Sequence, residues 1–297
     1  MSNLSFCVII KASMSEVFVF MDTKGIIIVR GGGDMATAVI HRLWRAGFRV
    51  LVLETDRPSA IRRQVAVSEA VYDGKAVVED MTAERVDDLS GCEPVWRSGH
   101  VPLIVDPKGV SIEILKPVVV IDAMIAKKNL GTHMNMAPLT IALGPGFSAG
   151  SDVHAVIETM RGHNLGRIIL SGSAQPNTGI PGKIAGYAQE RVIHASHAGV
   201  MRHIHAIGDY VNQGETIAVI RGEDGEHPVP ASISGLIRGL IREGFDVPKG
   251  FKIADIDPRR EEYANCFTIS DKARCIAGSV LELVCAHMMR YADEKRV

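Results

Sequence analysis

The pattern of apolar residues in the first half of the chain predicts strands and helices in alternation. Residues 26–29 form a short β-branched run without polar alternation, which is typical of a strand buried on both faces. Residues 35–46 then repeat apolar side chains at helical spacing, and Gly47 is suited to end this helix. Residues 50–53 form the next apolar run. This order predicts a strand–helix–strand unit with two parallel strands.

Four further strand-like runs follow, and helical sequence such as residues 82–89 separates some of them. The runs are KAVVED, VPLIVDP, KPVVVIDAMI and APLTIAL. Buried strands that alternate with helices favour a doubly wound sheet with right-handed crossovers. We therefore predict a Rossmann-like α/β domain with a mostly parallel sheet over residues 24–172.

A glycine-rich loop joins the first strand to the first helix. Gly31, Gly33 and Ala36 fit the pattern G-x-G-x-x-A, which permits a tight turn, a close phosphate group and close helix–sheet packing. Glu54 ends the second strand, where an acid can accept hydrogen bonds from a ribose. Asp34 either caps the helix or repels a pyrophosphate. The loop is predicted to bind a nucleotide, and a packing turn that binds none is the alternative.

The segment that begins with residues 139–143 repeats the order strand, glycine loop, helix and strand. Asp152, or Ser151 before it, is a natural N-cap for a helix predicted over residues 153–160. Ligands of open α/β sheets bind at the carboxyl edge of the strands. We therefore predict a second anion or ligand cradle there. Its glycines are Gly144, Gly146 and Gly150.

His154 and Glu158 are four residues apart and would share one face of this predicted helix. Such a pair, joined by Asp152 or His163, could contact a polar substrate, pass a proton or bind a metal. A surface pair that only stabilises the helix is the alternative. The pattern is not HExxH, which leaves the zinc-protease interpretation with little support, and no metal site is assigned.

The last third of the chain contains a short internal repeat. GDYVNQGETIAVI at residues 208–220 aligns with GFDVPKGFKIADI at residues 244–256, with six identities. A turn followed by a strand, used twice, predicts a β-rich module over residues 173–265. The module resembles the biotinyl/lipoyl barrel-sandwich. The interval RGEDGEHPVP lacks the lysine of such carriers, so we expect a structural or docking role without covalent biotin or lipoate.

A terminal helix is predicted within residues 266–297, with Ser270 as its cap and an apolar face that includes Ile276 and Val280. Lys272 and Arg274 lie in its first turn, where the helix dipole disfavours cations. They either contact an anionic partner or are solvated, and solvation is the favoured interpretation.

Four histidines lie just upstream of the repeat, and a metal could bind them. They are His194, His197, His203 and His205. Unligated, half-buried strand histidines are the commoner outcome, and this interpretation is favoured.

Composition bounds the remaining choices. A chain of 297 residues with a net charge of −1 accommodates about two domains and makes nucleic acid a poor partner. Five scattered cysteines without a CxxC motif favour a reducing, cytoplasmic setting. Residues 1–23 are an N-terminal extension that matches neither a signal peptide nor a membrane span, and an upstream start codon or an extra edge strand explains them.

Several stretches together resemble the YqeB family of selenium-dependent molybdenum hydroxylase system proteins. These are VRGGGDMATA, DAMIAKKNLGT, ALGPGFSAGSDVHAVIETMRGHNLGR, SGSAQPNTGIPG, SGLIRGLIREG and KIADIDPR with the following TISDKARCIAG. The resemblance covers roughly residues 24–288. It implies an accessory or maturation factor for a molybdenum hydroxylase, with distant similarity to xanthine dehydrogenase accessory proteins. No catalytic residues accompany it.

Two functions follow as hypotheses. In the first, the α/β domain holds a nucleotide or a molybdenum-pterin-type anion, and the β module docks to the partner enzyme. In the second, the protein is a free-standing NAD(P)-dependent oxidoreductase that uses the Gly31 loop and Glu54, although a convincing proton relay is missing. A structural scaffold is a third class, and a homo-oligomer is compatible with each.

Overall fold

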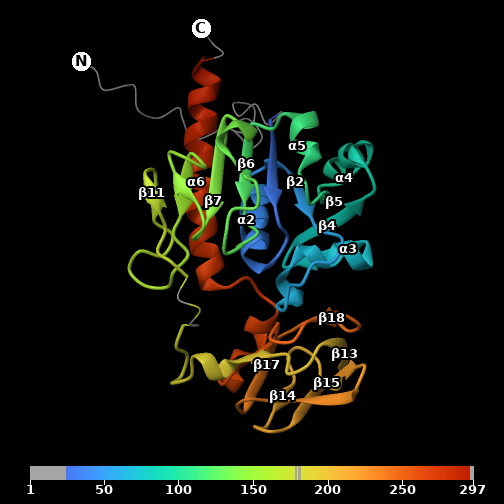
Figure 1. Ribbon diagram of the computed structural model, residues 1–297. Coiled ribbons are helices and arrows are strands. Elements are labelled where there is room, and N and C mark those ends of the chain that lie inside the picture. Colours follow the sequence, from blue (N-terminus) through green and yellow to red (C-terminus); the bar gives the residue numbers. More distant parts are fainter. Residues whose placement is uncertain (1–24, 178, 180–181, 295–297) are drawn as a thin grey trace, which may run out of the picture.

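The computed structural model describes residues 25–177, 179 and 182–294, and the predicted N-terminal extension lies outside them. The chain forms an α/β domain, a β module beside one edge of its sheet, and a long C-terminal helix (Figure 1). The α/β domain is built on a nine-stranded sheet with the order β10-β9-β7-β6-β1-β2-β5-β4-β3. Its strands are β1 (Ile26–Arg30), β2 (Arg49–Glu54), β3 (Lys75–Val78), β4 (Met81–Val86), β5 (Val101–Val105), β6 (Val119–Asp122), β7 (Leu139–Leu143), β9 (Ala155–Ile157) and β10 (Ile168–Ile169).

The sheet is mixed. The central strand β1 pairs in parallel with β2 and β6, and the parallel pairing continues to β4 on one side and β9 on the other. The outer strands β3 and β10 are antiparallel to their neighbours. Two short strands, β8 (Ser148–Ala149) and β11 (Gly172–Ser173), form a separate antiparallel pair.

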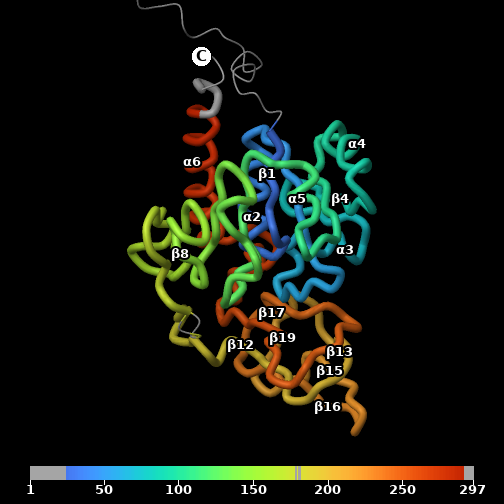
Figure 2. The backbone as a smooth tube through the Cα atoms, turned by 45° about the horizontal axis from the view of Figure 1, so that its top comes forward, coloured from blue at the N-terminus to red at the C-terminus, as the bar shows by residue number. Residues whose placement is uncertain are grey.

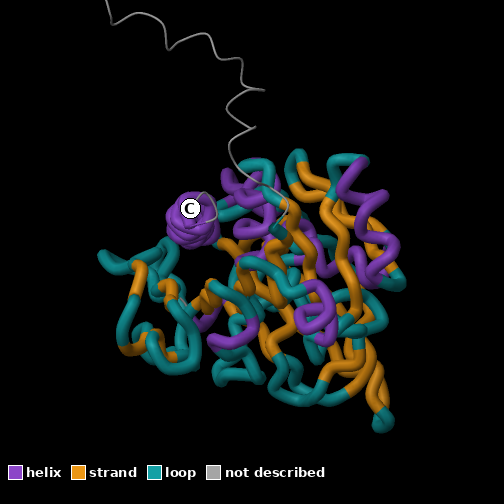
Figure 3. Tube along the Cα trace, turned by 90° about the horizontal axis from the view of Figure 1, so that it is seen from above, coloured by secondary structure: helices purple, strands orange, loops and turns teal. Residues whose placement is uncertain are grey.

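Helices cover both faces of the large sheet. On one face, α2 (Asp34–Arg45) and α6 (Asp271–Glu294) share an apolar core with alternate residues of β1, including Ile27 and Val29. On the other face, α4 (Cys92–Arg97) and α5 (Val110–Leu115) pack over Ile28. Figure 3 looks down on the C-terminal end of α6 and shows it beside the strands. The short helix is α3 (Ala70–Asp73), and the 3-10 turns are Arg63–Val65, Val67–Glu69, Leu89–Gly91, Met134–Met136, Gln189–Arg191 and Arg260–Cys266.

The predicted terminal helix and its cap are confirmed. Helix α6 begins after Ser270, whose hydroxyl accepts a hydrogen bond from the N–H of Ala273 at 3.2 Å. Ile276 and Val280 are fully buried in the core shared with α2. The helix follows the β module in sequence and returns to cover the α/β sheet.

Two predicted helices are strands. Residues 82–89 form most of β4, whose alternating burial fits a strand rather than a helix. Residues 153–160 contain β9, in which three successive residues, Ala155–Ile157, are all buried. A helix on the surface of a sheet exposes part of its circumference, so this continuous burial requires a strand within the sheet.

The β module consists of two four-stranded antiparallel sheets, β12-β19-β17-β14 and β16-β15-β13-β18. The internal repeat is visible as β14 with β15 and as β18 with β19. Each sheet combines the long strand of one repeat copy with the short strand of the other, which interlocks the copies. The strands are β12 (Val192–His194), β13 (Gly199–His203), β14 (Tyr210–Val211), β15 (Thr216–Gly222), β16 (Gly225–Pro230), β17 (Gly235–Leu240), β18 (Asp246–Val247) and β19 (Lys252–Asp257).

The predicted combination of a Rossmann-like, doubly wound domain with a barrel-sandwich module is therefore wrong. The large sheet is mixed, and β6, β7 and β9 follow one another without the α-helices that a doubly wound sheet requires. The C-terminal module is a pair of antiparallel sheets and is not assigned to the biotinyl/lipoyl type. The apolar runs located the strands, but they did not define the connections between them.

Specific polar contacts join the module to the α/β domain. Arg63 donates from Nε to the carbonyl of Leu240 at 2.8 Å, and the N–H of Leu240 donates to the carbonyl of Ile61 at 2.8 Å. Arg242 donates at 2.8 Å to both Glu69 and Asp73. These contacts hold the module against the segment that follows β2. Figure 2 shows the β module next to the α/β domain from a second direction.

None of the helices in the described part of the chain combines the length and the apolar character that a membrane span needs.

Candidate functional site

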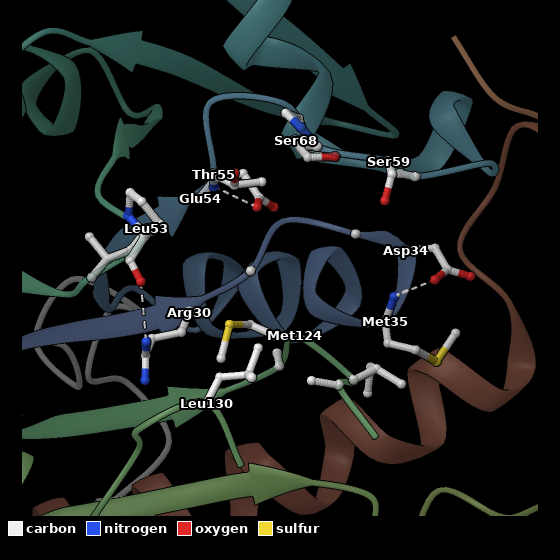
Figure 4. A pocket seen from close by; sticks show the side chains of 18 of the residues that line it. Arg30, Asp34, Met35, Leu53, Glu54, Thr55, Ser59, Ser68, Met124 and Leu130 are labelled. Atoms are coloured by element: carbon white, nitrogen blue, oxygen red, sulfur yellow. Dashed lines mark hydrogen bonds between the residues drawn. The ribbon is translucent and has the colours of Figure 1, made fainter. Parts of the chain in front are cut away.

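The glycine loop after β1 borders a cavity of about 550 Å³, the sheet-edge pocket. The pocket lies where β1 has β2 on one side and β6 on the other, the place at which open α/β sheets bind ligands. Figure 4 shows Glu54, Thr55, Ser59 and Ser68 on one side of the loop, with Met124 and Leu130 on the other.

The carboxylate of Glu54 is already engaged by the protein. It accepts hydrogen bonds of 2.7 Å from the backbone N–H groups of Gly32 and Thr55. Burial raises the pKa of Glu54, and the two N–H groups oppose that shift. The acid thus holds the loop to the end of β2, a contact that competes with the predicted ribose contact.

The predicted loop residues have packing roles. Gly31 has a φ of +99°, and a Cβ at this position would lie 3.1 Å from backbone atoms of Met124. The N–H of Gly31 donates to the carbonyl of Leu53 at 2.8 Å, and Ala36 is fully buried. Gly33 differs, because a Cβ there meets nothing within 4 Å. The glycine needed for close approach is Gly31, and its neighbour is another loop of the protein.

Carboxylates dominate the charge of the sheet-edge pocket. Asp34, Glu54 and Asp106 line it, whereas Arg30 is the one basic side chain among its described lining residues. Asp34 accepts from the N–H of Met35 at 2.9 Å, and Asp106 accepts from three N–H groups at the start of α5. A pyrophosphate bound in this pocket would face an acidic lining.

A buried network at the same edge was not predicted. The guanidinium of Arg30 donates to the hydroxyl of Thr132, and this hydroxyl donates to Asp122 at 2.6 Å. Arg30 also lies 4.0 Å from Asp122. Burial raises the pKa of Asp122, while Thr132 and Arg30 oppose the shift. The charged end of β1 is thereby neutralised inside the protein.

The second glycine loop does not begin a helix. Gly144 has a φ of +79°, and a Cβ would lie 2.7 Å from the hydroxyl of Thr159, while a Cβ at Gly146 would approach the backbone of Lys128 at 3.2 Å. Asp152 accepts a hydrogen bond from the N–H of Ser148 at 2.8 Å, which closes a turn. Gly150 also has a positive φ, +83°. These residues shape a compact turn between β7 and β9, and the predicted helix N-cap is wrong.

His154 and Glu158 flank β9 and serve different contacts. The Nδ1 atom of His154 lies 3.0 Å from the N–H of Thr140, and burial lowers the pKa of this histidine. The carboxylate of Glu158 accepts from the N–H groups of Met160 at 2.7 Å and Gln175 at 2.8 Å. The predicted helical pair is absent from the described residues, because these positions lie in and beside a strand.

The four histidines that were considered together as metal ligands each have different surroundings. His203 contacts the carbonyl of Ile241 at 2.7 Å, and His205 lies 3.1 Å from Glu215. His197 instead stacks on His227. His194 ends β12 and is exposed.

A second cavity, the interdomain cleft, lies between the Gly33 loop, the β module and the first turn of α6, with a volume of about 330 Å³. Its lining is cationic, since six of the residues are Lys or Arg and two are Asp. An adjoining cavity of about 440 Å³ adds further basic side chains. The cleft's charged residues are Arg62, Arg161, Arg191, Arg238, Lys252, Lys272, Asp34 and Asp255.

Some of these charges are compensated. Arg161 pairs with Asp271 at 2.9 Å, and Arg191 pairs with Asp255 at 3.2 Å. Among the ion pairs of the described residues, none involves the remaining cleft cations, Arg238, Lys252 and Lys272. The cleft therefore retains positive charge.

The Arg62 side chain is 8% exposed and lies 3.7 Å from the carboxylate of Asp34. It donates to the carbonyls of Asn265 and Thr268, yet its Nε is buried without a hydrogen-bond partner, as is the Nε of Arg238. Burial and the charge of Arg238 lower the pKa of Arg62. A lowered pKa of this kind is expected for a cation that is largely removed from water and lies near another cation.

The pKa of Lys272 is shifted in the same direction, because burial and the charge of Arg161 lower it. The sequence held one signal for the cleft, namely the cations in the first turn of the terminal helix. Lys272 lies in the cleft, whereas Arg274 pairs with Glu79 at 2.8 Å.

Comparison with known proteins identifies a relative. Over 257 residues, or 86% of its length, this chain is 49% identical to the uncharacterized protein YqeB of Escherichia coli (strain K12). This chain is a YqeB-family protein. It spans about half of that relative, 47% of its length. No family model matches the chain.

Similar solved structures include the ectoine utilization protein EutE of Ruegeria pomeroyi, 10% identical, with 78% of this chain and 85% of that chain covered and a TM-score of 0.26. A succinylglutamate desuccinylase/aspartoacylase of Rhodobacter sphaeroides is 13% identical, with 79% and 86% covered and a TM-score of 0.27. At these TM-scores the superpositions do not define a shared fold for the YqeB-family chain.

Both predicted functions are wrong as stated. The molybdenum hydroxylase accessory role and the NAD(P)-dependent alternative each placed an anion on the Gly31 loop, whose Gly31 and Gly32 N–H groups are bonded internally and whose pocket is acidic. The molybdenum and selenium link has no support in these comparisons, and the predicted cofactors and partner enzyme stay untested predictions.

Proposed function

We propose that this YqeB-family protein binds a small polyanion, of the pyrophosphate type, in the interdomain cleft. The observation that carries the proposal is the convergence of Arg62 and Arg238, each with a buried and unpartnered Nε, next to Lys272 without an ion-pair partner among the described residues. Like charges that face one another in a partly dry site destabilise it, and a bound anion relieves that repulsion.

The position of α6 supports the same ligand. This helix has 24 residues, and Ser270 and Lys272 at its start line the cleft. The N-terminal end of a long helix carries partial positive charge and favours anions. The dipole and the cleft's side chains thus act on a ligand in the same direction.

The volume and composition of the cleft define the ligand class. A cavity of about 330 Å³ accommodates a small molecule. Guanidinium groups bind phosphate or carboxylate oxygens in a bidentate manner, whereas Lys272 supplies a point charge. Because Arg62 belongs to the α/β domain and Arg238 to β17, a ligand between them would also join the two parts of the chain.

The test is calorimetric titration of the full chain with pyrophosphate at low ionic strength. We expect binding with a Kd of about 1 mM or tighter, which weakens as salt is added. Arg238→Gln and Lys272→Gln should each weaken binding roughly 10-fold or more, because each removes a charge-assisted hydrogen bond worth about 1.5–3 kcal/mol.

Lys249→Gln is the matched control, since Lys249 is exposed in the turn between β18 and β19, outside the lining of the cleft. It should leave the affinity unchanged. Failure of pyrophosphate to bind at millimolar concentration would overturn the proposal. So would equal weakening by all three substitutions, because a general surface-charge effect would then explain the data.

A further inference from the structure

Two histidines and an aspartate meet in the β module, and none of the three lines the interdomain cleft. His197 lies in the loop between β12 and β13, Asp224 lies in the turn between β15 and β16, and His227 is on β16. One potential ligand atom from each lies within 4.8 Å of the others. Two imidazoles and a carboxylate form a ligand set used for zinc and other divalent transition ions.

The two imidazole rings are stacked, and a rotation of one ring would bring a nitrogen of each toward a common ion. The centroids of His197 and His227 are 3.6 Å apart with an interplanar angle of 8°, and Nε2 of His227 lies 2.8 Å from the carboxylate of Asp224. Nδ1 of His197 lies 3.1 Å from the hydroxyl of Ser196. The Ser196 contact fixes the His197 ring through Nδ1 and leaves its Nε2 to a metal, whereas a metal at Nε2 of His227 would replace the proton that this nitrogen shares with Asp224.

Glycines keep this place open. A Cβ at Gly222 would lie 2.9 Å from a carboxylate oxygen of Asp224 and 3.5 Å from Nε2 of His227, so any side chain would intrude on the ligand atoms. Gly199 has a φ of +147°, and a Cβ there would lie 2.3 Å from the carbonyl oxygen of Arg221. These two positions let the His197 loop approach the turn closely.

From this geometry we infer that His197, Asp224 and His227 bind one divalent transition-metal ion, with zinc as the best fit. The ion would join the loop before β13 to the β15–β16 turn and would keep a coordination position for water. The carboxylate of Asp224 is free of arginine and lysine ion pairs in the described part of the chain, which leaves its charge available to a cation.

A second group, made of one histidine and two carboxylates, provides the internal comparison. His41 lies 2.6 Å from Asp80 and 3.9 Å from Glu79, but Arg45 pairs with Asp80 and Arg274 pairs with Glu79. Cations thus already neutralise both carboxylates. His41→Ala is therefore a control. It removes a histidine from a group in which a metal would have to compete with arginines for both carboxylates.

The experiment is titration of the tag-free full chain with Co²⁺, followed by displacement with Zn²⁺. We expect one equivalent of Co²⁺ to give visible d–d absorption that Zn²⁺ abolishes. His197→Ala and His227→Ala should weaken uptake about 100-fold or more, and Asp224→Asn about 10-fold, whereas His41→Ala should not change it.

Hydrogen exchange supplies the second readout. Zn²⁺ should slow exchange at the β15–β16 turn and around residues 195–198 in the wild type, and should have no such effect in His227→Ala. Absence of stoichiometric uptake by the wild type would overturn the inference. Unchanged uptake by both histidine variants would overturn it as well.

Discussion

The carboxylate of Glu54 accepts a 2.7 Å hydrogen bond from the backbone N–H of Gly32, so the acid at the end of β2 closes the glycine loop after β1. A carboxylate at this position of a nucleotide-binding fold can instead bind a ribose. The same sequence pattern is therefore compatible with two structures. The direction of the acid side chain distinguishes these two structures. In this protein the Glu54 carboxylate points to the glycine loop after β1.

We expect Glu54→Ala to destabilise the protein by about 1–3 kcal/mol, because it leaves the N–H groups of Gly32 and Thr55 without their acceptor in a largely buried place. Glu54→Gln should cost less, since its amide oxygen can still accept one bond. Urea denaturation measures the change. Glu113→Ala on the exposed side of α5 is the control and should stay within about 0.5 kcal/mol. A stability of Glu54→Ala equal to that of the control would contradict the assigned contact.

Sequence reasoning located the first strand–helix–strand unit because all of its signals are local. The apolar run of β1, the helical spacing of α2 and the loop glycines lie within about 30 residues of one another. The predicted helix over residues 153–160 was wrong for a physical reason. Val153, Val156 and Ile157 are β-branched and fully buried, and this enrichment favours a strand, whereas Asp152 resembled a helix cap but closes a turn.

Substitution of the loop glycines separates close packing from ligand approach. Gly31→Ala should lower the free energy of unfolding by about 1–2 kcal/mol or more, because φ is +99° and the Cβ would lie 3.1 Å from the backbone of Met124. Gly33→Ala is the matched control, with φ of −68° and nothing within 4 Å of the added carbon. It should be nearly neutral. Thermal melts of both variants test this, and a larger loss for Gly33→Ala would show that the loop geometry is misassigned.

The contact of Arg242 with Glu69 and Asp73 should stabilise the junction between the α/β domain and the module. Arg242→Met preserves packing on Tyr72 but removes the charge, and it leaves Glu69, 7% exposed, with Arg63 at 3.8 Å. We expect a loss of about 1–3 kcal/mol in chemical denaturation. Arg221→Met is the control, because Arg221 and Glu226 are both more than half exposed, and such pairs contribute about 0–1 kcal/mol. Equal effects would mean that the junction does not depend on this ion pair.

The interdomain cleft could not be predicted from local patterns. Arg62 follows β2, Arg238 is on β17 and Lys272 begins α6, so three parts of the chain far apart in sequence create its charge. Only the return of α6 to the α/β sheet places Lys272 beside the loop after β1. The cation in the first turn of α6 was the local feature that hinted at this cleft. That Lys272 lines a cleft follows only from the tertiary structure.

Lys272 should make stability depend on pH in a defined direction. Burial and Arg161 lower its pKa below the usual 10.5, so between the lowered pKa and 10.5 the unfolded chain binds more protons than the folded chain. Stability from this group therefore rises with pH across that window, and the cost of the charged lysine is fully present below it. Lys272→Gln should be more stable than the wild type near pH 7, and the difference should shrink as the pH rises toward about 10. Urea midpoints measured at several pH values test this, with Lys249→Gln as a control that shows no such trend.

Saturating pyrophosphate should stabilise the wild type more than Lys272→Gln, because the anion compensates the charge that the variant lacks. A variant that is less stable than the wild type near neutral pH would show that Lys272 is already compensated, and the cleft would then lose one of the three cations on which the proposed anion site depends.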